Sequence, residues 1–378
     1  MAYELTDEQT SIQQVVRRIG KEKVGPLVAE IEEKGVPGDL IRFLVKQGIF
    51  SLPYPKEYGG GGGDTLTFCL VIEELAKFCT NTPMFLLNQE LGALPIMIAG
   101  TDRQKAKYLP GIVSGEEICS FALTEPEAGS DAGSMKTTAV KEGTDYVING
   151  NKQFISLSDI ATRLCLFAKT DKEKGVKGIS AFIVEKPSPG FTVGKHEDKM
   201  GMRGISNCAL ILEDLRIPEE NMLGELGGGF RIAMKTLDAT RPLMGALAVG
   251  LAQGALDYAV EYCKQRIQFG RPIAQFQALQ FMVAQMSMEI EAARQLTYRS
   301  ASAVQGGGSE LSKLGAMAKC YATDVAMKVA TDAIQLMGGY GYMREYPLER
   351  KMRDAKLLQI VEGTNQIQRV VISRIVMK

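Results

Sequence analysis

One carboxylate near the end of the chain stands where it could act as a base. In "QIVEGTNQIQ", residues 359–368, Glu362 is followed by Gly363 and then by Thr364, whose hydroxyl is suited to begin a final helix. This motif alone leaves two interpretations open. Glu362 is either a general base or an ordinary solvated carboxylate in a turn, and the rest of the chain must decide between them.

A polar turn in the middle of the chain offers ligand-binding groups. The segment "FALTEPEAGSDAGSMKT", residues 121–137, follows a β run and holds the hydroxyls of Thr124 and Ser130. Hydroxyls and backbone N–H groups in such a turn can bind carbonyl or phosphate oxygens. The alternative is a hydrogen-bonded β turn without a ligand.

A second polar segment places two arginines beside a glycine. In "KQRIQFGRPIAQFQ", residues 264–277, Arg266 and Arg271 stand on either side of a turn at Gly270. Guanidinium groups are suited to phosphate, and the alternative is a solvated basic turn. The Gly-rich turn "QLMGGYGY", residues 335–342, gives a similar but weaker signal.

Several common chemical motifs are missing. No GxGxxG follows a strand to open a helix and no GxxxxGK[ST] occurs, so Rossmann and P-loop folds lose support. His196 is the only histidine and lies in a polar loop, which nearly excludes a Ser-His-Asp triad or a His-rich metal site. The seven cysteines form no CxxC pair, so we expect reduced structural thiols and no metal.

The composition of this chain argues against some classes of partner. Its 378 residues carry 44 basic and 44 acidic side chains, so no overall charge attracts nucleic acid or anionic lipid. The first residues lack the pattern of a signal peptide. No uninterrupted apolar run of about 18 residues occurs, so we expect no membrane insertion and a cytoplasmic location.

The elements that must position these motifs fall into three regions. The first is helical, because Thr6 begins a capping-box pattern and further helical segments cover 64–79 and 83–99. The middle has short β runs at 146–156, 164–169, 179–185 and 208–217, and Asn149-Gly150 predicts a hairpin turn inside the first of them. This region predicts a β barrel or sandwich.

The last region predicts a helical bundle. Long helical patterns cover 241–266, 276–304 and 309–339, and a terminal helix follows. Their apolar residues extend far round each helix, which favours burial in a homo-oligomer. The expected fold is mainly α with a central β domain, divided into residues 1–116, 117–222 and 223–378.

Seven motifs together resemble the acyl-CoA dehydrogenase family over essentially the whole chain. In family order they are "LTEPEAGSD", "NGNKQFIS", "EDKMGMRG", "RIQFGRPIAQFQ", "QLMGGYGY", "EYPLERKMRDAK" and "VEGTNQIQ". The resemblance implies an N-terminal α domain, a β domain and a C-terminal four-helix bundle. It also implies a homotetramer with one FAD per subunit, oxidation of an acyl-CoA, and electron-transferring flavoprotein as the electron acceptor.

The resemblance assigns the role of base to Glu362. Some members of the family carry the base on the first bundle helix instead, directly before an arginine, but that position here is Thr240. An α C–H beside a thioester is a weak acid, so hydrogen bonds to the thioester oxygen must stabilise the enolate charge. A carboxylate in a pocket without water has its pKa raised toward the operating pH.

Other roles follow by position. Thr124, Ser130, Phe154 and Ser156 match residues that hold the flavin ring, although the family often has Trp where Phe154 stands. The residues that match contacts to the rest of FAD, several of them from a neighbouring subunit, are Arg266, Gln268, Phe269, Gln335, Gly339, Thr364 and Gln366.

The acyl pocket is expected to differ from that of many members. Substrate contacts are expected from Ser130, Asp238, Arg241, Met84, Leu87, Leu91, Val361 and Gly363. Val361 replaces the usual Tyr before the base, which predicts a wider and more apolar pocket for a branched, cyclic or aryl-bearing acyl group. Glu90 either reaches this pocket or is paired or solvated at its rim. Thr82 stands near the position where glutaryl-CoA enzymes carry Arg, which disfavours a dicarboxylic acyl chain.

Alternative functions share these residues. An enoyl-CoA reductase working with electron-transferring flavoprotein would use the same site in reverse, and a short-chain acyl-CoA dehydrogenase would differ only in its pocket. An oxygen-using acyl-CoA oxidase would differ in solvent access to the flavin. A non-enzymatic scaffold is disfavoured because Glu362 and the flavin motifs are intact.

Overall fold

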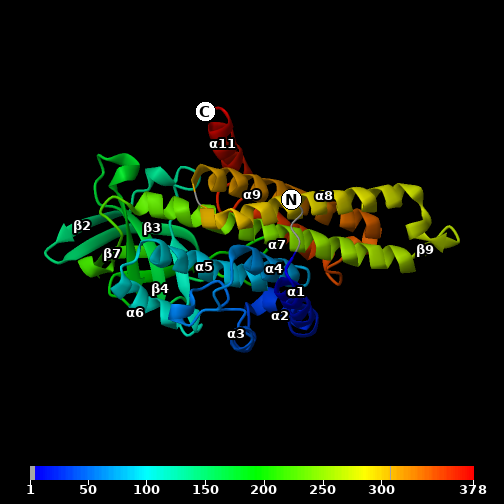
Figure 1. Cartoon of the computed structure of the whole chain (residues 1–378), viewed down its shortest axis with the longest axis horizontal. Helices are drawn as coiled ribbons and strands as arrows, with labels where there is room; N and C mark the ends of the chain where they lie inside the picture. Colours follow the sequence, from blue (N-terminus) through cyan, green and yellow to red (C-terminus); the bar gives the residue numbers. More distant parts are fainter. Residues whose placement is uncertain (1–4, 307) are drawn as a thin grey trace.

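The computed structural model describes residues 5–306 and 308–378. Helices come first along the chain, a sheet follows, and long helices complete it. In Figure 1 the sheet lies at one end of the molecule and the long helices extend away from it. The expected fold, mainly α with a central β domain, is confirmed.

The first region is built from α-helices that together contact both the sheet and the long helices. They are α1 (Asp7–Ile19), α2 (Val28–Lys34), α3 (Gly38–Lys46), α4 (Thr65–Ala76), α5 (Asn81–Ala99) and α6 (Asp102–Val113). The predicted capping box is present, because the Thr6 hydroxyl accepts the Gln9 N–H while the Gln9 side chain accepts the Thr6 N–H. Both α4 and α5 are buried on nearly every side, as helices apolar all round must be.

The strands of the second region form one mixed sheet. They are β1 (Cys119–Ala122), β2 (Thr138–Glu142), β3 (Asp145–Ser156), β4 (Arg163–Lys169), β5 (Ile179–Glu185), β6 (Phe191–His196), β7 (Asn207–Pro218) and β8 (Met222–Leu223). Their order is β6-β7-β3-β2-β4-β5-β8, with β1 parallel to β4. The expected runs at 164–169, 179–185 and 208–217 correspond to β4, β5 and β7.

The hairpin predicted at Asn149-Gly150 is wrong. Residues 145–156 form the single long strand β3, which pairs with β7 along most of its length. Gly150 marks a register shift rather than a turn, and the Asn149 side chain hydrogen-bonds across to Asp214 at 3.0 Å. Long-range pairing with β7 therefore overrides the local turn preference of Asn-Gly. The turn that does reverse the chain lies at 143–144, between β2 and β3.

Apolar residues lie on both faces of the sheet. One core contains Ile148 of β3, Leu166 of β4 and Leu210 of β7, so strands from different parts of the sheet contribute to it. The other core lies between the opposite face, which includes Phe167, and helices α5 and α6. A sheet covered on both faces is typical of a sandwich-like β domain.

Long helices form the last region. They are α7 (Gly229–Gln265), α8 (Gln277–Ser302), α9 (Gly308–Met337), α10 (Leu348–Leu358) and α11 (Asn365–Val376), with the short hairpin β9 (Ile267–Gln268) and β10 (Arg271–Pro272) after α7. Figure 1 shows α7, α8 and α9 side by side, with β9 at the end of the molecule away from the sheet. The helix α7 begins earlier than expected, because its interior accommodates Pro242.

The burial of α7 bears on the expectation of no membrane insertion, and the positions of α6, β1 and β8 bear on the predicted domain boundaries. In the described part of the chain, α7 alone is long and apolar enough to cross a membrane, and 78% of its most apolar stretch is buried inside the protein, as in a core helix. The predicted division after residue 116 falls between α6 and β1, and the division after residue 222 passes through β8. The domain boundaries stay a prediction.

Candidate active site

Glu362 lies in the loop between α10 and α11, and neighbouring side chains fix that loop. The Nζ atom of Lys319, a fully buried residue of α9, donates to the Gly363 carbonyl and to Asn365 Oδ1, both at 2.9 Å. The side-chain amide of Gln368 donates to the Glu362 carbonyl at 3.0 Å. These contacts hold Glu362 at a φ of 54°, a left-handed conformation that non-glycine residues seldom adopt.

Each residue of the Glu-Gly-Thr motif has its own structural role in this loop. Gly363 has a φ of 89°, and a Cβ there would come within 2.6 Å of the Gln368 amide nitrogen. Thr364 caps α11, because its hydroxyl accepts the Ile367 N–H at 3.3 Å. Within the described residues the Glu362 N–H has no protein acceptor. The motif thus leaves one backbone donor free beside the carboxylate.

The environment of Glu362 suits proton transfer. Burial raises the pKa of its carboxyl to about 7, and this increase is limited by the Thr240 hydrogen bond and by the charges of Arg241 and Lys319. The Thr240 hydroxyl donates to Glu362 Oε2 at 2.8 Å. A carboxylate with a pKa near neutral is matched to general base catalysis at ordinary pH. The solvated-turn interpretation therefore does not fit this residue.

Arg241 and Asp238 lie on the same helix, close to that carboxylate. They form an ion pair one turn apart on α7, and the Ser312 hydroxyl donates to the other oxygen of Asp238. The Arg241 side chain is almost completely buried. Its charge is among the influences that lower the pKa of Glu362. The structure thus places Arg241 near Glu362 and Asp238 beside Arg241, both on the first half of α7.

The expected acyl-pocket residues of α5 pack into the core that also contacts Val361. Met84 and Leu87 are buried there, and Val361 is half-buried against the same core. Leu91, one turn after Leu87, keeps part of its surface accessible. Val361 and the buried side chains of α5 therefore belong to the same extended core of the helical regions.

Glu90 points inward rather than pairing at a rim. Burial raises the pKa of its carboxyl to about 8, and the negative charge of Glu362 contributes to this increase. In the described part of the chain Glu90 Oε2 is inaccessible to solvent and has no hydrogen-bond partner. Both rim alternatives for Glu90 are therefore disfavoured.

A second group of expected residues surrounds an exposed aromatic ring. Phe154 has a φ of 60° in a bulge of β3, and 59% of its surface is exposed. Asn207 of β7 donates its side-chain amide to the Ser156 hydroxyl at 2.9 Å and to the Phe154 carbonyl at 3.1 Å. The Thr124 carbonyl accepts the N–H of the adjacent Gln153 at 2.9 Å. A flat apolar ring with flanking hydroxyls can receive a flavin ring.

The turn that carries Thr124 and Ser130 is held by a buried ion pair that was not predicted from the sequence. Lys152 of β3 is 0% exposed, and its Nζ lies 2.8 Å from Glu125 Oε1 and 3.2 Å from the Leu123 carbonyl. Although burial alone would raise it, the pKa of Glu125 is lowered by the charge of Lys152 and by hydrogen bonds. The sequence signal for this ion pair was Lys152, a lysine at a position of the β run whose side chain points into the protein.

Four expected cofactor residues line one cavity at the far end of α7. The cavity measures about 620 Å³, and its walls include Arg266, Gln268, Gln335 and Gly339. The Arg266 guanidinium lies 5.4 Å from the centre of the Tyr340 ring. Nothing lies within 4 Å of where a Gly339 Cβ would stand, so the backbone there is open to a ligand. Cationic, amide and glycine backbone donors together suit a phosphate-bearing ligand.

The remaining expected cofactor residues do not line that cavity. Phe269 has a φ of 52° at the tip of the β9–β10 hairpin and is 94% exposed. Thr364 and Gln366 lie at the start of α11, beside Glu362 in sequence. Thr240 and Arg266 are ~39 Å apart along α7 at the α-helical rise of about 1.5 Å per residue. The residues expected to hold FAD therefore form two separate groups.

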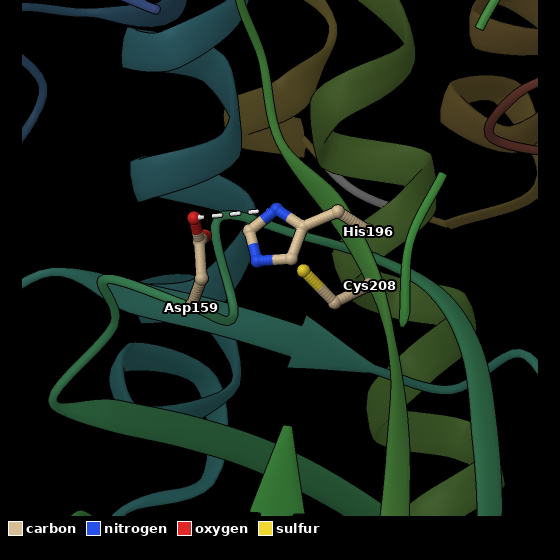
Figure 2. Close-up of side chains that lie close together, drawn as sticks. All are labelled: Asp159, His196 and Cys208. Carbon is tan, nitrogen blue, oxygen red and sulfur yellow. Dashed lines mark ion pairs between the residues drawn. The ribbon is translucent and has the colours of Figure 1, made fainter. Parts of the chain in front are cut away.

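His196 belongs to the group of side chains that Figure 2 shows, which lies next to the Phe154 ring because Cys208 pairs with Ile155 of β3. Asp159, His196 and Cys208 offer atoms within 4.8 Å of one another, with His196 Nδ1 4.0 Å from Asp159 Oδ2. The His196 side chain is 62% exposed, as expected for a surface residue. Burial raises the pKa of the Cys208 thiol, and a metal ligand must be a thiolate. All seven cysteines are buried and free, as predicted for structural thiols.

The residues present fit FAD. An exposed aromatic ring with hydroxyls stands in the β domain, and an open cavity with Arg266 and two amides stands at the end of the bundle. A flavin ring needs a flat apolar contact with polar edges, and a pyrophosphate needs cations and backbone donors. These two surfaces supply both kinds of contact.

Comparisons with known proteins agree with this fit. Three family models match the chain in order: the acyl-CoA dehydrogenase N-terminal domain at residues 6–116, the middle domain at 120–215 and the C-terminal domain at 227–377. A short-chain specific acyl-CoA dehydrogenase of Clostridium acetobutylicum is 46% identical over 375 residues, which cover 99% of each chain.

Two further proteins are similar over nearly their whole length. The cyclohex-1-ene-1-carbonyl-CoA dehydrogenase of Syntrophus aciditrophicus is 46% identical, over 98% of this chain and 90% of its own. A solved chain from work on the electron transferring flavoprotein of Acidaminococcus fermentans and on flavin-based electron bifurcation is 47% identical, with a TM-score of 0.97 and full coverage of both chains. The chain therefore belongs to the acyl-CoA dehydrogenase family of FAD-dependent oxidoreductases.

Proposed function

We propose that Glu362 is the base that removes the α proton of an acyl-CoA thioester. The observation that carries this proposal is a half-buried residue in a rigid turn, whose carboxyl has its pKa raised by burial to about 7 and lies with one oxygen 2.8 Å from the Thr240 hydroxyl. Deprotonated Glu362 accepts the proton on its carboxylate. The neutral acid that forms is favoured by the same burial that raised the pKa.

The chain also supplies charge stabilisation to the thioester. The free N–H of Glu362 is proposed to donate to the thioester oxygen as enolate charge develops there. Lys319 and Gln368 keep this donor and the carboxylate in one fixed geometry, which favours alignment of the reacting C–H bond. FAD, when bound, supplies the acceptor for the β hydride.

The two groups of cofactor residues are proposed to serve different parts of FAD. Thr124, Ser130, Phe154 and Ser156 would hold the flavin ring. Arg266, Gln268, Gln335 and Gly339 would hold the phosphate and adenosine part, and Phe269, Thr364 and Gln366 would complete the contacts. The ~39 Å between Thr240 and Arg266 means that both groups serve one FAD only if they come from two copies of the chain. A homotetramer is therefore part of the proposal.

The acyl group is proposed to be branched, cyclic or aryl-bearing. Val361 precedes Glu362 and is half-buried against the core that contains Met84 and Leu87, so a small residue borders the reacting carbons. Similarity to a cyclohex-1-ene-1-carbonyl-CoA dehydrogenase supports this choice. Asp238, Arg241 and Gly363 would contact the thioester end and Leu91 the acyl end.

A short straight-chain acyl group is the second candidate. The relative from Clostridium acetobutylicum is named short-chain specific and is equally identical to this chain. The same residues also serve the reverse reaction, in which an enoyl-CoA is reduced. Similarity to a chain from work on an electron transferring flavoprotein supports such a flavoprotein as the electron partner in either direction. A cytoplasmic location without membrane insertion stays a prediction.

Glu362→Gln tests the proposed base. The amide keeps the shape of the side chain but cannot accept the proton, so we expect FAD and acyl-CoA binding to persist while turnover falls by about 10³-fold or more. The measurement is anaerobic flavin bleaching by a panel of acyl-CoA thioesters. Release of hydrogen peroxide in air would identify the protein as an oxygen-using acyl-CoA oxidase instead of a dehydrogenase.

Glu362→Asp is the matched control, because it keeps a carboxylate on a shorter side chain and should retain part of the activity. Turnover close to that of the unmodified protein in a fully flavin-loaded Glu362→Gln variant would reject Glu362 as the base.

A further inference from the structure

Two buried polar atoms beside the proposed acyl pocket have no partner. The Tyr54 hydroxyl belongs to a residue that is 1% exposed, and in the described residues it neither donates nor accepts a hydrogen bond. Glu90 Oε2 is also buried, and it has no hydrogen-bond partner among the described residues. Tyr54 packs in the same core as Ala93 of α5, which lies three residues after Glu90 and so on the same face of that helix. Burial raises the pKa of the Tyr54 hydroxyl, and the charge of Glu90 adds to this effect. Buried polar groups without partners destabilise a fold, which makes such a pair notable.

Glu90 faces the acyl pocket from its deep side. It stands on α5 three residues after Leu87, and so on the same face of the helix as Leu87. Leu87 packs in the core that Val361 also contacts, and the charge of Glu362 contributes to the raised pKa of Glu90. Part of the Glu90 residue stays accessible although Oε2 is not, as expected for a side chain that borders an internal space.

The chemistry of this pair selects one kind of acyl substituent. A second carboxylate on the substrate would be desolvated beside two acidic side chains, Glu90 and Glu362, and Thr82 of α5 carries no positive charge to offset this cost. A purely apolar chain would leave both polar atoms without partners. A hydroxyl both donates and accepts, so it can bond to a carboxyl oxygen and to a phenol at once.

We propose that Glu90 and Tyr54 form a polar subsite in the acyl pocket that receives a hydroxyl group carried by the acyl chain. The inference rests on the proposed function, because it takes the space between α5 and Glu362 as the acyl pocket. Glu90 acts in substrate specificity and takes no part in the proton transfer itself.

Matched pairs of substrates test the subsite. Pentanoyl-CoA and 4-hydroxybutyryl-CoA differ only by a methyl in place of a hydroxyl, and so do 3-(4-methylphenyl)propionyl-CoA and 3-(4-hydroxyphenyl)propionyl-CoA. In at least one pair we expect the hydroxyl member to have a kcat/KM higher by about tenfold or more, because it satisfies the buried polar atoms. Glu90→Leu should reverse that ratio, Tyr54→Phe should reduce it, and Glu90→Gln should keep most of it.

Calorimetric binding of the same pairs to the Glu362→Gln variant provides a readout without turnover. If no thioester bleaches the flavin of the unmodified protein, the proposed function fails, while calorimetry still reports whether the hydroxyl is preferred. The subsite is wrong if neither pair favours the hydroxyl, or if Glu90→Leu leaves the ratio unchanged. The latter result would mean that water alone satisfies the two atoms.

Discussion

At the scale of single residues, Glu362 shows how a turn can be made reactive. Its left-handed backbone is unfavourable for a residue with a side chain, and it persists because Lys319 and Gln368 hold the two carbonyls of the turn. The same loop partly buries the residue, and burial raises the pKa of the carboxyl to about 7. Position and reactivity therefore have one structural origin.

Thr240→Val should shift the pH dependence of the reaction. The base acts in its deprotonated form, so kcat/KM should increase as pH rises through the pKa of Glu362. The Thr240 hydroxyl lowers that pKa by donating to the carboxylate. Its removal, at about 1 kcal/mol for the hydrogen bond, should move the rise to higher pH by about half a unit to one unit.

The check is a pH profile of kcat/KM across the neutral range for Thr240→Val and Thr240→Ser. Serine keeps the hydroxyl, so its profile should coincide with that of the unmodified protein. An unshifted profile in Thr240→Val would show that the hydrogen bond does not control the base.

Val361→Tyr should change the ranking of substrates. A phenol at this position would fill about one aromatic ring of volume beside the reacting carbons. We expect the unmodified protein to favour a cyclic or aryl-bearing acyl-CoA over butyryl-CoA by about tenfold in kcat/KM, because a straight C4 chain leaves apolar space unfilled. Val361→Tyr should reverse this order, and Val361→Ile serves as a control of smaller volume change. If butyryl-CoA is the best substrate and Val361→Tyr leaves the ranking unchanged, the wide-pocket proposal is wrong and the short-chain candidate stands.

At the scale of elements, a buried ion pair joins β3 to the turn that carries Thr124 and Ser130. Lys152 and Glu125 are both almost inaccessible to solvent and lie 2.8 Å apart. Glu125 also accepts the N–H of Thr137 at 3.1 Å, so one carboxylate secures both ends of the turn. A paired buried charge is tolerated, whereas a single unpaired one is strongly unfavourable.

Lys152→Met should therefore destabilise the protein by about 3–5 kcal/mol, because it leaves the Glu125 carboxylate buried without its cation. FAD should also dissociate more easily, since the turn with the two hydroxyls loses its anchor. Denaturant unfolding and the flavin content after gel filtration measure the two effects.

The double variant Lys152→Met/Glu125→Gln removes the unpaired charge and should recover part of the lost stability. Equal stability of the single variant and the unmodified protein would mean that Glu125 is neutral in the folded chain.

At the scale of the whole molecule, the two groups of cofactor residues stand at opposite ends of α7. One chain cannot bring Arg266 to a flavin whose ring lies beside Glu362, because ~39 Å of helix separates Arg266 from Thr240. The outer surface of α8 exposes Phe281 and Met288, apolar side chains that a second copy could cover. Both observations support an assembly in which neighbouring subunits complete each FAD site.

Arg266→Ala should weaken FAD retention and subunit association together. The guanidinium is proposed to bind phosphate of an FAD shared with a neighbouring subunit, so its loss should lower the flavin-to-protein ratio after dilution. Light scattering on the same samples should show dissociation in parallel with the loss of flavin. Arg231→Ala, an exposed arginine at the other end of α7, is the matched control and should change neither property. A stable monomer that keeps its full complement of FAD would contradict the shared site.

The sequence by itself determined the family and the order of helical and β regions, and it predicted which residues form the site. Local rules suffice for such features: the capping box at Thr6, the cap at Thr364 and the periodic apolar patterns act over a few residues. Glu362 was identifiable because its motif keeps a fixed spacing to glycine and threonine.

Only the tertiary structure decided which distant residues meet. The Asn149-Gly150 turn gave way to pairing with β7, because many long-range ladder contacts outweigh one local preference. Lys152 and Lys319 looked like ordinary lysines, yet burial beside carboxylate or carbonyl oxygens makes them structural supports of the two sites. The inward position of Glu90 likewise depends on how α5 packs against α4 and α7. Burial and charge pairing are properties of the assembled fold, so residue type and spacing alone cannot supply them.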